Sequence, residues 1–302
     1  MIRTDKSFND FNWVETEALT DEERTALAEQ YGLTEEMITY VTDKDESPHY
    51  VYDDDTDNEL ITLHVPYILD QTKLKYITRP VSFLMHSGNL FTFNESRLEE
   101  VNTIFQQVGR DSTTKRADLF ILEAMFAMMD SYIPVMRLIT RQRNQMDKVL
   151  SKNAKNKDLI ALSYLRQTLT FFSSAVQLNL DLLNKLGSTH FGKTGDDDRM
   201  DGIEDVHIES EQVQRMIEIE TQVVERISDT FNSVVNNNLN DIMEILTIWS
   251  LTMAVPTILT GFYGMNVHLP FEKWANAWVF IIILSAVFII WLLMILKFHR
   301  RK

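Results

Sequence analysis

Two long runs of uncharged, mostly apolar residues dominate the pattern of hydrophobic and polar positions, and both lie in the last fifth of the chain. A helix of about 20 residues, rising about 1.5 Å per residue, crosses the roughly 30 Å of hydrocarbon in a bilayer. The pattern therefore predicts transmembrane helices at residues 245–264 and 275–296, an external loop at 265–274 and a basic tail at 297–302.

The first 110 residues mix short helical and strand patterns, which predicts an α/β domain. Thr20 and Glu23 form a capping-box pattern for a short helix that ends before Gly32, and Thr34 precedes a second short helix. Strands are expected at residues 60–65, 81–86 and 90–93, with a turn at 87–89 and an exposed acidic loop at 53–58.

Residues 111–202 read as a helical part of the same soluble region. A helix over 115–150 should kink at Pro134, a return helix should cover 158–186, and the glycines and acids of 187–202 predict a loop. A stalk helix at 203–244 should then run straight into the first membrane helix. Its apolar residues recur about every 3.5 positions, which indicates either an oligomeric stalk or a tightly packed bundle. They are Ile203, Val206, Val213, Ile217, Val224, Ile227, Phe231 and Val234.

The charge of the chain is −15 and is unevenly distributed. From Asp241 onward there are three acidic and five basic residues, so the acidic excess lies before that point. This acidic excess argues against nucleic acid as a partner, because phosphate binding needs a basic face. The chain contains no cysteine, and its polar N-terminus lacks the apolar core of a signal peptide. We therefore expect a multi-pass protein of the lipid bilayer, with both termini in the cytoplasm and the basic tail on that side.

One face of the first membrane helix carries mostly small and polar residues, interrupted by the apolar Met243 and Leu246. The full set, which we call the stripe, is Asn236, Asn240, Met243, Leu246, Ser250, Ala254, Thr257 and Gly261. Small residues permit close packing against a neighbouring helix, so the stripe has a purely structural interpretation. Alternatively, several copies surround a pore in which Met243 and Leu246 form an apolar constriction. Neither apolar run contains a titratable Asp, Glu, Lys, Arg or His, which argues against a proton-coupled carrier.

The tetrapeptide Tyr263-Gly264-Met265-Asn266 follows a helix that contains Pro256 and lies about 36 residues before the C-terminus. This motif resembles the signature of the CorA family of divalent-cation channels, and the layout of the whole chain is similar to that family. The resemblance implies a homopentameric funnel: an α+β cytoplasmic domain joined by a long stalk helix to a two-helix transmembrane hairpin. It also implies a channel in the plasma (bacterial inner) membrane that takes up Mg²⁺, and also Co²⁺ and Ni²⁺. The membrane potential would drive uptake, and intracellular Mg²⁺ would close the channel.

The same resemblance assigns roles to individual positions. Gly264, Met265 and Asn266 match the selectivity ring that receives hydrated Mg²⁺, and the stripe matches the pore lining, with Met243 and Leu246 as its gate. Asp229 matches an acidic ring in the cytoplasm. Glu204 and Asp205 are candidates for the regulatory Mg²⁺ site, although acids at a helix start are also explained by the helix dipole.

Two alternatives stay open beside the Mg²⁺ channel. The family includes zinc transporters of the ZntB type, and nothing in the stripe excludes Zn²⁺. Many members carry Met-Pro-Glu-Leu after the signature, whereas here Pro270 is present and the acid is displaced to Glu272. A membrane-anchored scaffold that conducts nothing is the second alternative. An enzyme is the weakest interpretation, because the sequence has no phosphate loop, nucleophile elbow or His-Glu zinc motif.

Overall fold

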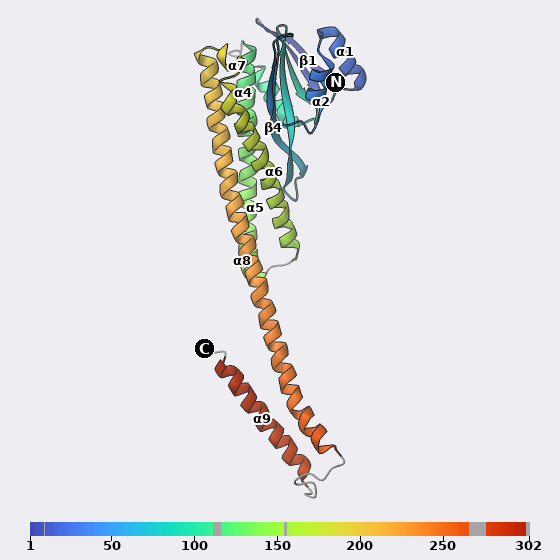
Figure 1. Ribbon diagram of the computed structural model, residues 1–302, viewed down its shortest axis with the longest axis vertical. Coiled ribbons are helices and arrows are strands. Elements are labelled where there is room, and N and C mark those ends of the chain that lie inside the picture. Colours follow the sequence, from blue (N-terminus) through green and yellow to red (C-terminus); the bar gives the residue numbers. More distant parts are fainter. Residues whose placement is uncertain (9, 111–115, 154–155, 266–275, 300–302) are drawn as a thin grey trace. The chain divides into compact units, whose positions relative to one another are not determined.

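The computed structural model describes residues 1–8, 10–110, 116–153, 156–265 and 276–299 (Figure 1). Its contacts divide the chain into two compact units, Met1–Ser228 and Asp229–Lys302. The first unit holds a β-sheet and a helical bundle. The second holds the C-terminal part of one long helix and the last helix of the chain.

The sheet of the first unit has six strands in the order β1-β2-β6-β5-β4-β3. Neighbouring strands are antiparallel, except that β2 and β6 are parallel. The strands are β1 (Ile2–Ser7), β2 (Asn12–Glu17), β3 (His49–Asp53), β4 (Asn58–Asp70), β5 (Lys75–His86) and β6 (Asn89–Asn94).

The helices of the described residues are α1 (Asp21–Tyr31), α2 (Glu35–Thr42), α3 (Glu99–Val108), α4 (Ala117–Asp130), α5 (Tyr132–Asn153), α6 (Asn156–Leu186), α7 (His190–Lys193), α8 (Asp197–Tyr263) and α9 (Ala277–His299). Some of those in the first unit cover the two faces of the sheet. On one face, α1 and α2 bury apolar residues such as Leu27 and Met37 against Phe91 and Phe93 of β6. On the other face, Trp13 of β2 packs against Phe105 and Phe120 of α3 and α4. Because both faces are covered, the first half of β4 is buried as a continuous run, from Asn58 to Leu63. This is the α+β domain that the sequence predicts.

The local signals at the start of the chain are confirmed. The backbone N–H of Glu23 donates to the Thr20 side chain (3.3 Å), and the Glu23 side chain accepts from the backbone N–H of Thr20 (3.0 Å). Gly32 ends α1 at φ +70°, a left-handed conformation in which glycine carries no Cβ penalty. Thr34 caps α2 by accepting from the backbone N–H of Met37 (3.3 Å).

The predicted strands lie within β4, β5 and β6, and the hairpin turn is where it was expected. Ser87 and Gly88 both have positive φ, as a two-residue turn between twisted strands requires. The expected loop at 53–58 is wrong at both ends, because Asp53 belongs to β3 and Asn58 is a buried residue of β4. β1, β2 and β3 were not predicted individually.

Two of the predicted helical boundaries are also wrong. The kink expected at Pro134 is instead a break at Ser131 between α4 and α5. Pro134 lies in the first turn of α5, where a missing backbone N–H removes no helical hydrogen bond. The loop expected at 187–202 contains α7 and the start of α8. Asp196 caps α8 by accepting from the backbone N–H of Arg199 (3.2 Å), so the run of acids marks a helix start.

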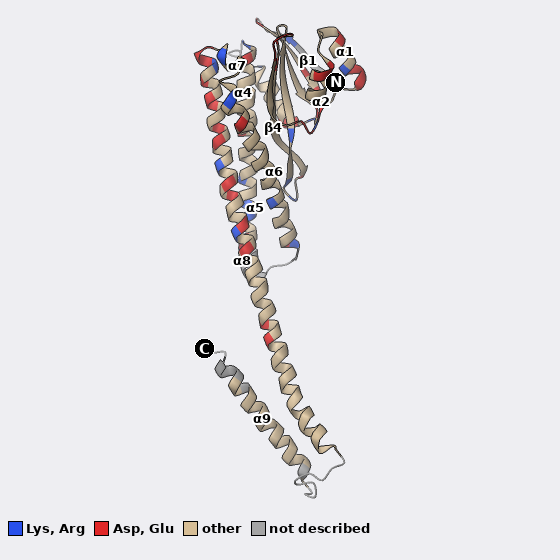
Figure 2. Cartoon of the chain, in the orientation of Figure 1, with Lys and Arg blue, Asp and Glu red and all other residues tan. Residues whose placement is uncertain are grey.

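The 3.5-residue apolar pattern of α8 is satisfied within the chain as a packed bundle. Its members are buried from Ile203 as far as Phe231, whereas Val234 is exposed. An ion pair between Arg143 of α5 and Glu220 of α8 (2.8 Å) joins the two helices. Figure 2 shows acidic residues recurring along α8. The last of them in the sequence is Glu244, beyond which this helix carries no charged residue.

Two stretches of the described residues are long and apolar enough to span a membrane, by length and composition. The stretch Ala117–Lys148 is mostly buried inside the first unit and forms part of its core. No residue of the most apolar part of α8 is buried in the single chain. In α9 the described apolar stretch is shorter, Trp278–Leu292.

Candidate functional site

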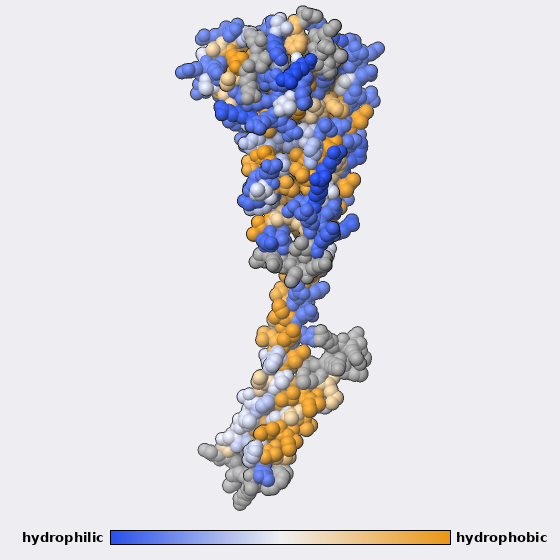
Figure 3. All heavy atoms as spheres, turned by 180° about the vertical axis from the view of Figure 1, so that it is seen from behind, coloured by the Kyte–Doolittle hydropathy of each residue, from blue (hydrophilic) through white to orange (hydrophobic). Residues whose placement is uncertain are grey.

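The stripe occupies one side of the C-terminal part of α8. At 3.6 residues per turn, successive positions are about 100° apart, so its eight residues fall within about a third of the helix circumference. Met243 of the stripe is 59% exposed, and Trp249 on the other side of the helix is 60% exposed. In Figure 3 the second unit accordingly displays pale polar surface beside strongly apolar surface. Exposure in one chain therefore does not separate a pore-facing side from a lipid-facing side.

The hydroxyl groups of the stripe are held in one orientation by the helix itself. Ser250 donates to the carbonyl oxygen of Leu246, and Thr257 donates to that of Met253, both at 2.8 Å. With its hydrogen used in this way, each hydroxyl offers only oxygen lone pairs to its surroundings. A row of such acceptors suits the outward-pointing hydrogens of a hydrated cation.

The predicted selectivity ring lies only partly within the described residues. α8 ends at Tyr263, and the backbone N–H of Gly264 donates to the carbonyl oxygen of Thr260 (2.9 Å). A Cβ at Gly264 would stand 3.2 Å from that same oxygen, so the tight turn leaves little room for a side chain. Met265 is exposed. Asn266 lies outside the described residues.

The three predicted acidic residues are separated along α8. Asp229 is exposed and is the first residue of the second unit. Glu204 and Asp205 are exposed in the first unit, near the start of the helix. The 24 residues from Asp205 to Asp229 correspond to about 36 Å of helix, so they belong to different sites.

Asp205 contributes to an acidic groove of about 420 Å³ between α4 and α8. Three further carboxylates line the groove, Glu123 of α4 and Asp198 and Asp201 of α8, beside the apolar side chains of Leu119, Leu122 and Phe126. Glu204 does not line it. The sequence analysis did not identify Glu123, Asp198 or Asp201 as site residues. Asp198 and Asp201 share one helix face with Asp205 (i, i+3, i+7), but this is evident only once the segment is known to be helical. Only the fold brings Glu123 beside them.

Buried charges fix the start of α8 against α4 and so position this groove. Asp118 is buried and accepts from Arg199 Nε at 2.6 Å, while Arg116 pairs with both Asp118 and Asp196. Burial raises the pKa of Asp118, but the hydrogen bonds from the two arginines outweigh it and hold that pKa below its usual value. The hydrogen bond from Arg116 also lowers the pKa of Asp196 to about 2.

No group of three or more His, Cys, Asp or Glu side chains among the described residues is placed to hold a metal ion. The acids of the α4–α8 groove line one surface without converging on one point. A cation bound there would have to keep much of its water shell or take ligands from a second copy of the chain.

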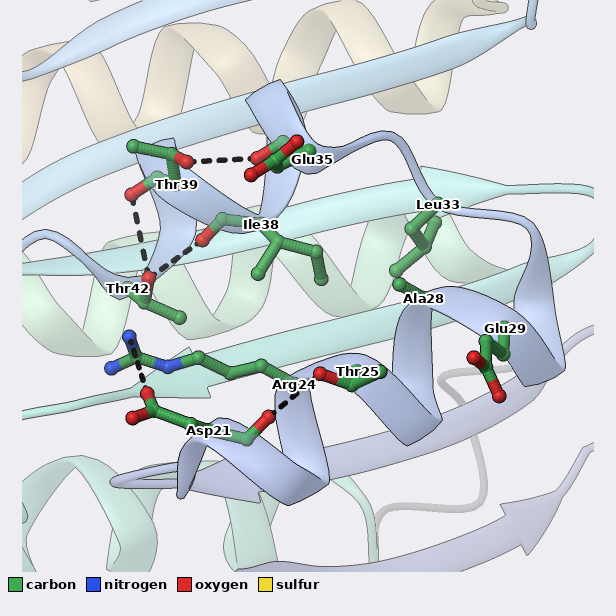
Figure 4. Close-up of a pocket in the computed structure, with 10 residues that line it drawn as sticks. All are labelled: Asp21, Arg24, Thr25, Ala28, Glu29, Leu33, Glu35, Ile38, Thr39 and Thr42. Atoms are coloured by element: carbon green, nitrogen blue, oxygen red, sulfur yellow. Dashed lines mark hydrogen bonds and ion pairs between the residues drawn. The ribbon is translucent and has the colours of Figure 1, made fainter.

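Another groove, of about 660 Å³, lies between α1 and α2 (Figure 4) and contains none of the predicted site residues. The hydroxyls of Thr25, Thr39 and Thr42 all donate to carbonyl oxygens of their own helices. Arg24 lies within the groove and pairs with Asp21 at 3.5 Å. We assign no role in transport to it.

Comparison with known proteins assigns the whole chain to one family. Residues 8–300 match the family model described as CorA-like Mg²⁺ transporter protein. The cobalt/magnesium transport protein CorA of Methanocaldococcus jannaschii is 23% identical over 304 residues, which is 97% of this chain and 92% of that protein. The complete structure of the CorA magnesium transporter from the same organism superposes with a TM-score of 0.83 at 20% identity, covering 97% of this chain and 92% of that one.

A more distant structural neighbour bears on the zinc alternative. The cytoplasmic domain of ZntB from Vibrio parahaemolyticus matches with a TM-score of 0.61 at 12% identity, covering 76% of this chain and 89% of that one. At this identity the likeness concerns the fold alone. The matched relatives are transporters rather than enzymes, in agreement with the sequence prediction.

Proposed function

The chain belongs to the CorA family of Mg²⁺ transporter proteins, and from this premise we propose that it is a channel for divalent cations with Mg²⁺ as its main substrate. Co²⁺ and Ni²⁺ are the further ions that such a channel would carry. The relative from Methanocaldococcus jannaschii is named for cobalt and magnesium transport, which supports this substrate class.

The observation that carries the proposal is the row of oriented acceptors on α8. Mg²⁺ gives up its water reluctantly, so a pathway for it must hold the hydrated ion without binding it tightly. The hydroxyl oxygens of Ser250 and Thr257 and the amides of Asn236 and Asn240 are neutral acceptors of this kind. A carboxylate at the same positions would bind the ion far more strongly and slow its release.

Two membrane helices in one chain cannot enclose a pathway, so the channel requires an oligomer, and we take it to be a homopentamer. Five copies of the stripe would line the pore, with Met243 and Leu246 as an apolar constriction that can lose its water. Gly264, Met265 and Asn266 would form the outer selectivity ring, and Asp229 an acidic ring at the cytoplasmic side. α9, apolar on all sides, would face lipid.

The proposal places both termini in the cytoplasm and the pore in the bacterial inner membrane. An inside-negative potential then drives cations inward, and the acidic first unit raises their local concentration. Intracellular Mg²⁺ would close the channel by binding at the top of α8, where Glu204 and Asp205 lie. As Mg²⁺ is lost, the carboxylates would repel one another and the constriction would widen.

Uptake of Mg²⁺ into proteoliposomes under an inside-negative potential tests the proposal directly. Wild type should take up Mg²⁺, and Asn266→Ala should abolish uptake because it removes the amide ring. Uptake of Zn²⁺ without Mg²⁺ by wild type would instead support the zinc transporter. No uptake of either ion by wild type would favour the scaffold.

A pair of threonine variants tests the stripe within the same helix. Thr257→Val removes a hydroxyl from the stripe, whereas Thr252→Val makes the same change on the opposite side of α8. We expect Thr257→Val to lower the rate of Mg²⁺ uptake several-fold and Thr252→Val to leave it near wild type. Equal effects would mean that the stripe serves helix packing rather than conduction.

A further inference from the structure

A cavity of about 360 Å³ lies in the first unit, where β4, β5 and the loop after α2 meet α6. Its charged walls are Lys44, Arg79 and Asp45, and Asp45 pairs with Arg79. His64, Phe171 and Leu178 also line it. The cavity thus has two cationic groups against one carboxylate, a local positive excess in a protein whose net charge is −15. Such an excess in an acidic protein points to an anionic ligand.

Arg79 is held in place but keeps donors available. Its Nη1 donates to the carbonyl oxygen of Lys44 (3.1 Å) and pairs with Asp45, and its guanidinium lies over the ring of Tyr67, 5.9 Å from the centroid. Both of these hydrogen bonds use Nη1, which leaves Nη2 and Nε for a ligand. Lys44 is exposed, and its charge also helps to lower the pKa of Glu95.

His64 contributes a fixed polar wall to the cavity. Its Nε2 lies 2.8 Å from the carbonyl oxygen of Glu46, so this nitrogen carries the hydrogen and donates it. Nδ1 is then an acceptor for the Thr78 hydroxyl at 3.5 Å. Burial lowers the pKa of His64 and outweighs the hydrogen bond to Glu46 and the charge of Asp45, which raise it, in keeping with a neutral ring.

The opposite wall is apolar and belongs to α6. Phe171 and Leu178 are 39% and 38% exposed although both are large hydrophobic side chains. They are seven residues apart and so lie on one face of the helix. Ser174, between them on the same face, also lines the cavity and is exposed.

We propose that this cavity binds an organic phosphate of about the size of a nucleoside monophosphate. The phosphate would accept from Arg79 and Lys44, because a guanidinium and an ammonium group together match its charge and its several oxygens. The flat ring would cover Phe171 and Leu178 and remove their apolar surface from water. The volume lies at the lower end of the range found for small-molecule sites. The site is separate from the stripe and from the α4–α8 groove.

Calorimetric titration of the full-length protein with adenosine 5′-monophosphate, at constant Mg²⁺, tests the inference. We expect one saturable site per chain. Lys44→Gln should weaken binding about tenfold by removing a charge-assisted contact. Ser174→Leu should weaken it comparably by filling the space between Phe171 and Leu178. Arg166→Gln, an exposed change on α6 outside the cavity, should leave the affinity unchanged.

Inorganic phosphate and adenosine, titrated separately, identify which part of the ligand is recognised. Both should bind more weakly than the monophosphate if the phosphate and the ring each contribute. The proposal is overturned if the monophosphate does not bind, or if inorganic phosphate binds equally well. It is also overturned if Lys44→Gln and Ser174→Leu both bind like wild type. These results do not depend on ion transport, so they leave the proposed channel function untouched.

Discussion

Glu220 shows how a single buried carboxylate can organise two helices. It accepts from the Thr140 hydroxyl (2.8 Å) and from Arg143 Nε (3.0 Å), and it is almost fully buried between α5 and α8. Each oxygen of Glu220 therefore has a partner, which is the condition under which a buried charge is tolerated.

Glu220→Ala should lower the free energy of unfolding by about 1–3 kcal/mol, because it leaves the half-buried guanidinium of Arg143 without its carboxylate partner. Glu225→Ala, on an exposed side of the same helix, should change it by no more than about 0.5 kcal/mol. Chemical denaturation followed by tryptophan fluorescence measures both. Equal losses in the two variants would mean that the ion pair contributes nothing beyond helix propensity.

Glu95 carries a charge that the fold disfavours. Its side chain is 3% exposed, accepts from the backbone N–H of Leu19 (3.1 Å) and lies 3.8 Å from Arg24. Burial raises its pKa, and these two partners offset that effect only in part. The folded state thus binds a proton on the Glu95 carboxyl more tightly than the unfolded state does. This proton binding stabilises the fold fully at pH values below the pKa that Glu95 has in the unfolded chain. The stabilisation is lost as the pH rises through the pKa that Glu95 has in the folded protein.

Glu95→Gln should therefore raise the thermal midpoint at pH 7, since the amide can still accept from Leu19 but carries no charge. The gain over wild type should shrink as the pH is lowered toward 4, where wild-type Glu95 becomes protonated. Glu99→Gln, an exposed change nearby, serves as the control. Thermal scans from pH 4 to 8 would contradict this account if the gain did not vary with pH.

At the scale of elements, signals confined to a few neighbouring residues were readable from the sequence. The cap at Thr20, the left-handed Gly32 and the turn at Ser87 and Gly88 each depend on local chemistry, and each lies where it was expected. β1 is an edge strand of mixed polar residues, and pairing with β2 rather than its own pattern makes it a strand.

The candidate site follows the same rule. The stripe needs only the periodicity of one helix and was identified from it. The α4–α8 groove needs Glu123 from a second helix, together with a helical start for α8 at Asp197. In the sequence, the capping residue Asp196 and the acids after it look like a solvated loop. The structure shows instead that arginines bind Asp118 and Asp196 and hold this segment as the start of a helix.

The buried face of α8 makes a further prediction for this element. Ile217 is fully buried in the bundle, so Ile217→Ala should lower the free energy of unfolding by about 2–5 kcal/mol through lost burial and a residual cavity. Ile160→Ala on α6 makes the same change at an exposed position and should cost about 0.5 kcal/mol or less. Denaturant midpoints of the two variants should therefore separate clearly. If they coincided, α8 would be held by contacts other than this face.

At the scale of the whole molecule, α8 leaves large apolar side chains uncovered by its own chain. Ile208 and Ile219 are 52% and 60% exposed and lie three turns apart on one face, opposite the bundle. In the proposed pentamer this face is where a neighbouring copy would pack. Changing both residues to Asp should shift the assembly toward smaller species in native mass spectrometry, whereas Ile160→Asp on α6 should not. A pentamer that persists in the double variant would place the subunit contact elsewhere.

Regulation by Mg²⁺ also belongs to the whole molecule, because the described acids of one chain form no complete metal site. In the proposed mechanism, Mg²⁺ inside the cell bridges carboxylates at the top of α8 and keeps the pore closed. Asp205 lines the acidic groove with Asp198 and Asp201, whereas Glu204 lies outside it. Two residues that are adjacent in the sequence thus differ in position, and the proposed mechanism predicts the larger effect for Asp205.

Uptake into proteoliposomes loaded with increasing internal Mg²⁺ tests this assignment. For Asp205→Asn we expect the internal concentration that halves uptake to rise about tenfold, because a charged ligand is lost, while uptake at low internal Mg²⁺ stays near wild type. Glu204→Gln should have a smaller effect, and Glu225→Gln, an exposed acid further along α8, should have none. If Asp205→Asn and Glu204→Gln are both inhibited like wild type, these acids only stabilise the helix start, and the sensor lies elsewhere. If Glu204→Gln has the larger effect, the ion binds outside the α4–α8 groove.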